Sequence, residues 1–84
     1  MVSWGKGGDN VQKLHAEALR LNLRENLRRY RDRAGLSQRQ VAGELGLSRS
    51  AYTYYETGKT TPSAVDLFTL AQLYRVPVEE LFRP

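Results

Sequence analysis

The sequence predicts an all-α fold: a five-helix domain over residues 23–84, preceded by an extra N-terminal helical segment at residues 9–22. Apolar residues recur at spacings of three and four, which is the period of one helix face. Serines stand where helices need an N-terminal cap, and glycines stand where helices end. A chain of 84 residues has room for one domain, whose core must use most of the apolar residues.

The N-terminal third has two parts. Residues 1–8, MVSWGKGG, hold three glycines and no periodicity, which is typical of a disordered tail or a remnant of expression cloning. From about residue 10 a helical pattern runs toward Gly35, which can end it in a left-handed conformation. Asn22 and Glu25 form a candidate capping pair, so we favour a break near Asn22. A single continuous helix is the alternative, because one apolar stripe runs through Leu19, Leu23, Leu27 and Tyr30.

The middle of the chain predicts two short helices joined by a tight turn. A capping box formed by Ser37 and Gln40 starts the first helix, and Gly46 ends it. Ser48 and Gly58 mark the limits of the second helix. Everything else in the chain is expected to hold or orient this second helix.

The second helix of the pair has two unlike sides. Ala51, Tyr52 and Tyr55 share one side, which can pack. The other side carries Arg49, Ser50, Thr53, Tyr54 and Thr57. Hydrogen-bonding side chains with almost no negative charge suit base edges and the phosphates beside them. From spacing alone, a merely solvated face is an equal alternative.

Two further helices are predicted after this pair. Ser63 and Asp66 form a capping box for the first, and Pro77 opens the last. The apolar residues expected to face the core are Leu67, Leu70, Ala71, Tyr74, Leu81 and Phe82, with Phe68 and Leu73 at the edges of the stripe.

Positive charge is concentrated just before the helix pair. The chain has a net charge of +4, and residues 23–40 alone contribute six arginines against two acids, which is also +4. Such a concentration is typical of a nucleic-acid footprint. An arginine-rich helix surface is as often only solvated.

Several classes of protein are disfavoured. Without cysteine there are no disulfides or thiolate metal sites, and the lone His15 lacks partner ligands, so we expect no metal and no cofactor. No apolar run approaches the roughly 20 residues of a membrane span, and no secretory signal is present, so we expect a cytoplasmic protein. There is no Ser-His-Asp set, no phosphate cradle and no acid pair beyond Glu79-Glu80, so we expect no enzyme.

A set of residues in the middle of the chain resembles the lambda-repressor-like, Cro/XRE-type helix-turn-helix DNA-binding domains. The matching positions are Ser37-Gln38, Val41-Ala42, Leu45-Gly46, Ser48, Glu56, Gly58 and Pro62. The resemblance extends from about Leu23 to Phe82. It implies a transcriptional regulator, most simply a repressor encoded by a prokaryote or phage, that reads the major groove of double-stranded DNA with the helix at about residues 48–57.

The resemblance also implies which residues contact DNA. They are Gln38, Arg49, Ser50, Thr53, Tyr54, Lys59 and Thr60. Of these, Gln38 is expected to hold phosphate on one side of the groove, and Lys59 and Thr60 are expected to hold the other side. Arg49 is expected to read guanine. Because one reading helix spans few base pairs, we expect a homodimer on a palindromic or pseudo-palindromic operator.

Two positions bear on how the domain is held together. The resemblance implies a structural ion pair between Arg31 and Glu56. Three further arginines are expected to contribute to the electrostatic field of the domain rather than to make direct contacts: Arg24, Arg28 and Arg29. Tyr52 departs from the family, which most often has isoleucine or valine there, so its hydroxyl must find a partner or reach solvent.

An alternative function belongs to another class of protein. The bundle could be a protein-interaction module, such as an antitoxin or bridging factor, that binds a protein partner through residues 9–22. The sequence does not choose between a phage repressor, a restriction-modification controller and an antitoxin, or between repression and activation.

Overall fold

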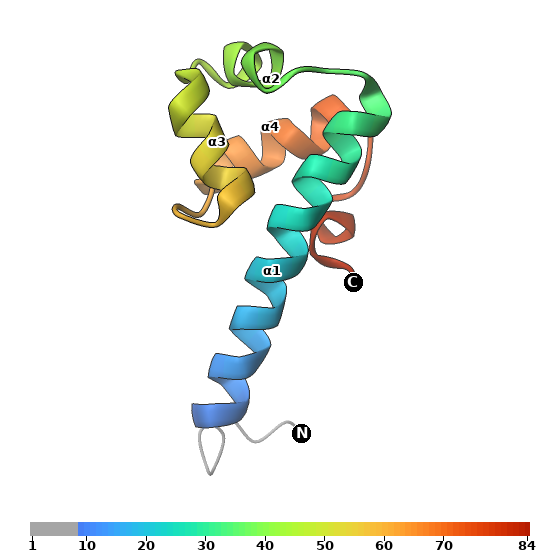
Figure 1. The fold of residues 1–84 in the computed structure, drawn as a ribbon. Coiled ribbons are helices and arrows are strands. Elements are labelled where there is room, and N and C mark those ends of the chain that lie inside the picture. Colours follow the sequence, from blue (N-terminus) through green and yellow to red (C-terminus); the bar gives the residue numbers. More distant parts are fainter. Residues whose placement is uncertain (1–8) are drawn as a thin grey trace.

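The computed structural model describes the backbone of residues 9–84 and the side chains of residues 15–84, so the prediction for residues 1–8 lies outside it (Figure 1). Its elements are the α-helices α1 (Asp9–Ala34), α2 (Gln38–Leu45), α3 (Arg49–Thr57) and α4 (Ala64–Tyr74), then the 3₁₀ helix η1 (Val78–Phe82). The all-helical class is confirmed for the described part of the chain. The expected count of five helices is not confirmed, because residues 9–84 form four α-helices and the last element is a short 3₁₀ helix.

Helix α1 is continuous over 26 residues, so the break expected near Asn22 is wrong. The Asn22 side chain does not start a helix, because its Nδ2 donates to the Phe82 carbonyl oxygen at 3.0 Å. The apolar stripe instead continues through this point, and its members Leu23 and Leu27 are buried. The C-terminal half of α1 therefore packs within the bundle, while its N-terminal half projects beyond it (Figure 1).

The caps of the two short helices form as predicted. Gln40 N donates to Ser37 Oγ at 3.0 Å and Ser37 N donates to Gln40 Oε1 at 2.8 Å, which completes the capping box of α2. Ser48 Oγ accepts from the Ala51 amide at 3.1 Å. Gly58 follows α3 with φ +82°, a left-handed conformation that glycine adopts without steric cost. Both helices thus begin and end where local chemistry places them.

Only half of the predicted box forms at the start of α4. Ser63 Oγ accepts from the Asp66 amide at 3.1 Å. The Asp66 carboxylate instead accepts the Tyr55 hydroxyl at 2.6 Å. The bond between Tyr55 and Asp66 ties α4 to α3. Burial together with this hydrogen bond raises the pKa of Tyr55.

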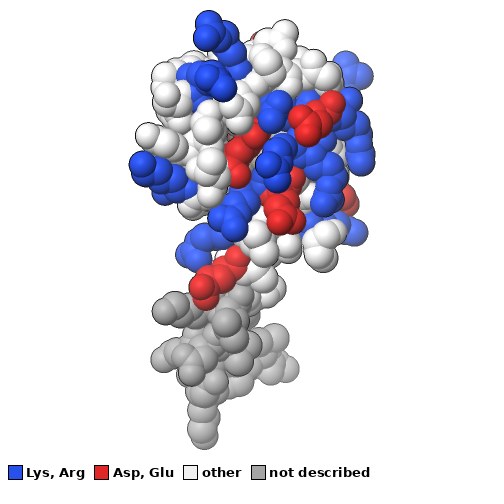
Figure 2. Space-filling view, viewed as in Figure 1, with Lys and Arg blue, Asp and Glu red and all other residues white. Residues whose placement is uncertain are grey.

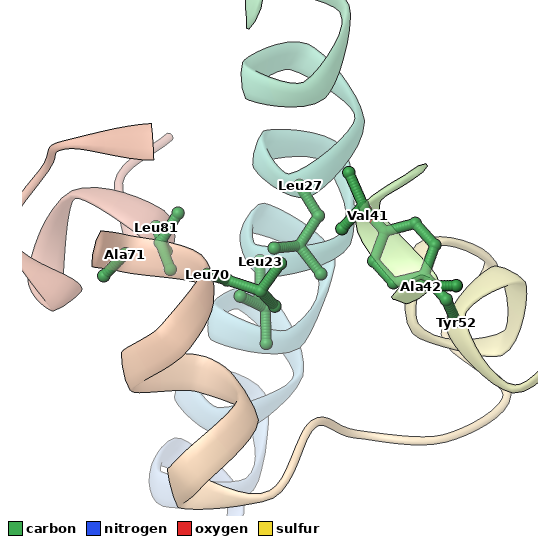
Figure 3. Close-up of a cluster of buried hydrophobic side chains, with 8 residues drawn as sticks. All are labelled: Leu23, Leu27, Val41, Ala42, Tyr52, Leu70, Ala71 and Leu81. Carbon is green, nitrogen blue, oxygen red and sulfur yellow. The ribbon is translucent and has the colours of Figure 1, made fainter. Parts of the chain in front are cut away.

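The core lies around the C-terminal half of α1 (Figure 3). Its fully or nearly fully buried members are Leu23, Leu27, Val41, Ala42, Tyr52, Leu70, Ala71 and Leu81. Residues of α2 and α3 meet α1 from one side, and residues of α4 and η1 meet it from the other (Figure 3). Burying each large apolar side chain contributes roughly 1.5–3 kcal/mol, so this one cluster organises the domain. Phe68, expected at the edge of the stripe, is exposed.

Asn26, which the sequence analysis passed over, holds the C-terminal segment. It is only 3% exposed, and its Nδ2 lies 3.0 Å from the Leu81 carbonyl oxygen and 2.7 Å from that of Arg83. Its Oδ1 accepts from Arg29 Nη1 at 3.0 Å. These bonds satisfy carbonyls at the end of η1 that a helix terminus leaves unpaired.

No helix within the described residues is both long enough and apolar enough to cross a membrane.

Candidate nucleic-acid interface

Helix α3 presents two flanks with different chemistry. We call the side of Tyr52 and Glu56 the network flank, because both side chains hydrogen-bond within the chain. We call the side of Arg49, Ser50 and Tyr54 the open flank, because all three are exposed. The network flank fixes the position of the open flank.

The network flank centres on an ion pair between α1 and α3. Arg31 Nε donates to Glu56 Oε2 at 2.6 Å and Arg31 Nη2 donates to Glu56 Oε1 at 3.1 Å. The third guanidinium nitrogen, Nη1, donates to the Leu36 carbonyl oxygen at 3.0 Å. The side chains are 13% and 4% exposed for Arg31 and Glu56. A buried, two-pronged pair of this kind fixes the angle between the helices that carry it.

Two more donors reach the same carboxylate. The Tyr52 hydroxyl donates to Glu56 Oε2 at 2.6 Å, and Gln38 Nε2 donates to Glu56 Oε1 at 3.1 Å. The tyrosine that departs from the family pattern therefore places its hydroxyl on Glu56 rather than in solvent. Helices α1, α2 and α3 all meet at this one acid.

These contacts shift the pKa values of the network. Burial favours the neutral form of Glu56, but the hydrogen bonds from Arg31, Tyr52 and Gln38 outweigh it and lower the Glu56 pKa. The pKa of Arg31 is raised, chiefly by its hydrogen bond to Glu56. Burial and the Glu56 hydrogen bond raise the pKa of Tyr52. Glu56 is therefore ionised and Tyr52 neutral at physiological pH.

Two of the predicted DNA-contacting residues take part in this network. Gln38 bonds Glu56, as above, and its Oε1 lies 3.2 Å from the Thr53 hydroxyl. That hydroxyl also lies 2.8 Å from the Arg49 carbonyl oxygen, a bond within α3. Both side chains are partly buried, so Gln38 and Thr53 lie at the edge of the open flank rather than at its centre.

The open flank is joined by the loop after α3. Lys59 Nζ stands 4.5 Å from the centroid of the Tyr54 ring, a cation–π contact, and Tyr54 is 38% exposed. The Thr60 amide donates to the Tyr54 carbonyl oxygen at 3.3 Å, which folds the loop against the helix. The first turn of α3 carries no acid. In the view of Figure 2, basic side chains stand at the edge bearing α2 and α3, whereas basic and acidic side chains alternate along α1.

Arg24 makes a contact that was not predicted. Its Nη1 donates to the Thr57 carbonyl oxygen at 3.2 Å, at the C-terminus of α3. A Cβ on Gly58 would lie only 2.6 Å from that nitrogen, a clash that the long, exposed Arg24 side chain can relieve by moving, so the need for glycine there comes from its left-handed conformation. The missed signal was spacing: Arg24 lies two turns before Arg31, so both arginines project from the same side of α1 toward α3.

The middle of α1, between Glu17 and Arg24, and the loop after α3 enclose a surface cleft of about 450 Å³. Its lining residues are Glu17, Arg20, Leu21, Leu23, Arg24, Tyr55, Gly58, Thr60, Thr61 and Pro62. The cleft thus adjoins the loop of the open flank and contains two arginines.

The fold and site define a class of protein, and comparison with known proteins supports it. Residues 22–82 match the helix-turn-helix domain family, and the chain belongs to that family. The resemblance inferred from the sequence is confirmed at this level.

Several relatives bear names of the same kind. The chain is 34% identical over 59 residues to YqaE of Bacillus subtilis, an uncharacterized HTH-type transcriptional regulator, covering 70% of this chain and 51% of YqaE. It is 30% identical over 61 residues to RstR of Vibrio cholerae, a transcriptional repressor of the cryptic phage CTXphi, covering 73% and 54%. It is 33% identical over 60 residues to MJ0272 of Methanocaldococcus jannaschii, an uncharacterized HTH-type transcriptional regulator, covering 71% and 91%.

The match therefore spans about half the length of YqaE and RstR and most of MJ0272. No solved structure gives a significant match.

Proposed function

We propose that the chain is a sequence-specific regulator of transcription that reads the major groove of double-stranded DNA with the open flank of α3. One observation carries the proposal: Arg49, Ser50 and Tyr54 are exposed together, beside Lys59. The one acid of α3, Glu56, is paired with Arg31 on the other flank. The flank offered to DNA is therefore free of uncompensated negative charge. The name of the relative RstR favours repression.

Each residue has a role that its chemistry fits. Arg49 can grip guanine through two acceptors, while Ser50 and Tyr54 reach neighbouring base edges, a thymine methyl or phosphate. Lys59 and Thr60 hold phosphate on one side of the groove. On the other side, Gln38 uses one amide hydrogen for Glu56 and has a second available for phosphate.

The assembly on DNA is expected to be a homodimer. One helix of nine residues reads few base pairs, so useful affinity requires two half-sites about 34 Å apart on a palindromic or pseudo-palindromic operator. Sedimentation of the protein with a short duplex should give two copies per site. One copy per site at saturation would rule out the dimer.

Arg49→Ala is the decisive test of the base-reading role. Loss of a two-pronged guanine contact should cost about 1–3 kcal/mol and relax preference at one base position. The measurement is selection of bound sites from randomised duplexes, followed by binding titrations with the selected site. Arg33→Ala, which removes an equal charge on α1 instead of α3, should leave the selected sequence unchanged. An unaltered preference in Arg49→Ala would show the assignment to be wrong.

A further inference from the structure

We propose that the cleft between the middle of α1 and the loop after α3 binds backbone phosphates of DNA, beyond the base pairs that α3 reads. The inference rests on the proposed function and extends it to a new site. It gives the projecting half of α1 a role in DNA binding, in place of the protein contact considered from the sequence.

The chemistry of the cleft suits phosphate. Arg20 and Arg24 line one wall and the hydroxyl-bearing Thr60 and Thr61 line the other. Both arginines are exposed, and among the described side chains neither forms an ion pair. Guanidinium groups and hydroxyls are the side-chain donors that most often meet phosphate oxygens.

One of these groups is already held in place. Arg24 donates one hydrogen bond to the Thr57 carbonyl oxygen and lies beside Gly58, so its guanidinium group already stands at the cleft before any ligand arrives. A guanidinium group has five donors, so most remain for a ligand. Arg20 lies one turn earlier, about 6 Å along the helix axis. That distance is close to two base-pair steps at about 3.4 Å each, so the two arginines can meet successive parts of one strand.

Continuity with the open flank favours DNA over a separate small anion. Thr60 belongs both to the cleft and to the loop that folds against Tyr54. A strand that leaves the groove along Lys59 and Thr60 meets the cleft next. Glu17 also lines the cleft, and its carboxylate opposes phosphate. Removing this acid should therefore change DNA affinity in the direction opposite to removing an arginine.

The test measures the salt dependence of binding by the full chain. The probe is the duplex selected from randomised DNA, flanked by about ten base pairs on each side, roughly one further turn of helix. Arg20→Gln should reduce the slope of log affinity against log salt by about 0.9 for each bound copy, or about 1.8 for the proposed dimer, which corresponds to about 60-fold weaker binding at 0.1 M salt. Glu17→Gln should tighten binding. The matched control is Arg33→Gln, an equal charge loss beside Tyr30 and outside the cleft.

The outcomes separate two kinds of failure. If Arg20→Gln and Arg33→Gln change the slope equally, or if neither changes it, the cleft is not a phosphate site and this inference is overturned. If the flanking DNA is removed so that only the half-sites remain, the slope of the wild-type chain should fall toward that of Arg20→Gln. If the wild-type chain selects no sequence at all, the proposed function itself fails. Because Arg20 is exposed and unpaired, a circular dichroism melt should show that its variant folds normally.

Discussion

The two flanks of α3 contain the same residue types in opposite circumstances. Tyr52 is fully buried with its hydroxyl on Glu56, whereas Tyr54, two positions later, is 38% exposed. Arg31, which reaches α3 from α1, donates to three acceptor oxygens, whereas Arg49 is exposed on the other side. Residue type alone therefore does not distinguish the side chains that hold the fold together from those left exposed on the open flank. The number of hydrogen bonds that each side chain makes within the chain does distinguish them.

The difference also has an electrostatic consequence. In the proposed complex, an unpaired carboxylate on α3 would repel the phosphates on either side of the groove. Arg31 compensates the charge of Glu56, while Tyr52 and Gln38 fill its remaining acceptor sites. The network flank thus supports the open flank in two ways, by fixing the angle of α3 and by compensating the charge of the one acid on that helix.

The largest expected effect comes from breaking the network at its centre. Glu56→Ala leaves Arg31 buried without its partner and removes the acceptor of Tyr52. Breaking a buried pair in this way costs about 3–5 kcal/mol, a large share of the roughly 5–15 kcal/mol that stabilises a small domain. Urea unfolding followed by circular dichroism measures the loss.

Glu80→Ala is the matched control. Glu80 pairs with Arg83 at 3.0 Å, but the Arg83 side chain is 67% exposed, and such pairs contribute at most about 1 kcal/mol. If the two variants lost equal stability, burial would not be what distinguishes the network flank.

A smaller effect is expected when one hydroxyl is removed from each flank. Tyr52→Phe deletes a donor to a buried carboxylate and should cost about 1.5–3 kcal/mol of unfolding free energy. Tyr54→Phe makes the same chemical change at an exposed position and should stay within about 0.5 kcal/mol. The same urea titration serves for both. Equal losses would contradict the division of α3 into two flanks.

Local chemistry made much of the fold predictable. The capping box at Ser37 and the left-handed glycines at positions 46 and 58 depend on residues near in sequence, and all formed as expected. The break at Asn22 was predicted from the same kind of local signal and is wrong. There, an apolar stripe that continues into a buried core outweighs one capping pair, and the asparagine bonds Phe82, 60 residues away.

The site was predictable only in part, for a related reason. The exposed positions of α3 follow from its helical period, so Arg49, Ser50 and Tyr54 could be named in advance. The partners of Gln38, Arg24 and Asn26 could not, because each bond joins segments that only the folded chain brings together. Long polar side chains reach too far for spacing to fix their partner.

The mildest way to perturb the network is acid, which removes the charge of Glu56 and leaves its side chain in place. Because the folded-state pKa of Glu56 is lowered, its ionisation stabilises the fold above the ordinary carboxyl pKa of about 4.3. That contribution is lost as the pH falls through the lowered value. Stability should therefore decline below about pH 5, and the decline should be smaller and end at higher pH in Tyr52→Phe, because the loss of one donor leaves the Glu56 pKa less lowered.

Glu56→Gln isolates the part of this decline that belongs to the network. The amide cannot titrate, so the variant should be less stable at neutral pH but should depend less on pH below about 5. Other acids also take part in the fold, among them Asp66, which accepts the Tyr55 hydroxyl at 2.6 Å. If Glu56→Gln and wild type declined in parallel, those acids would set the acid stability of the domain. The charge of Glu56 would then matter for the open flank but not for the fold.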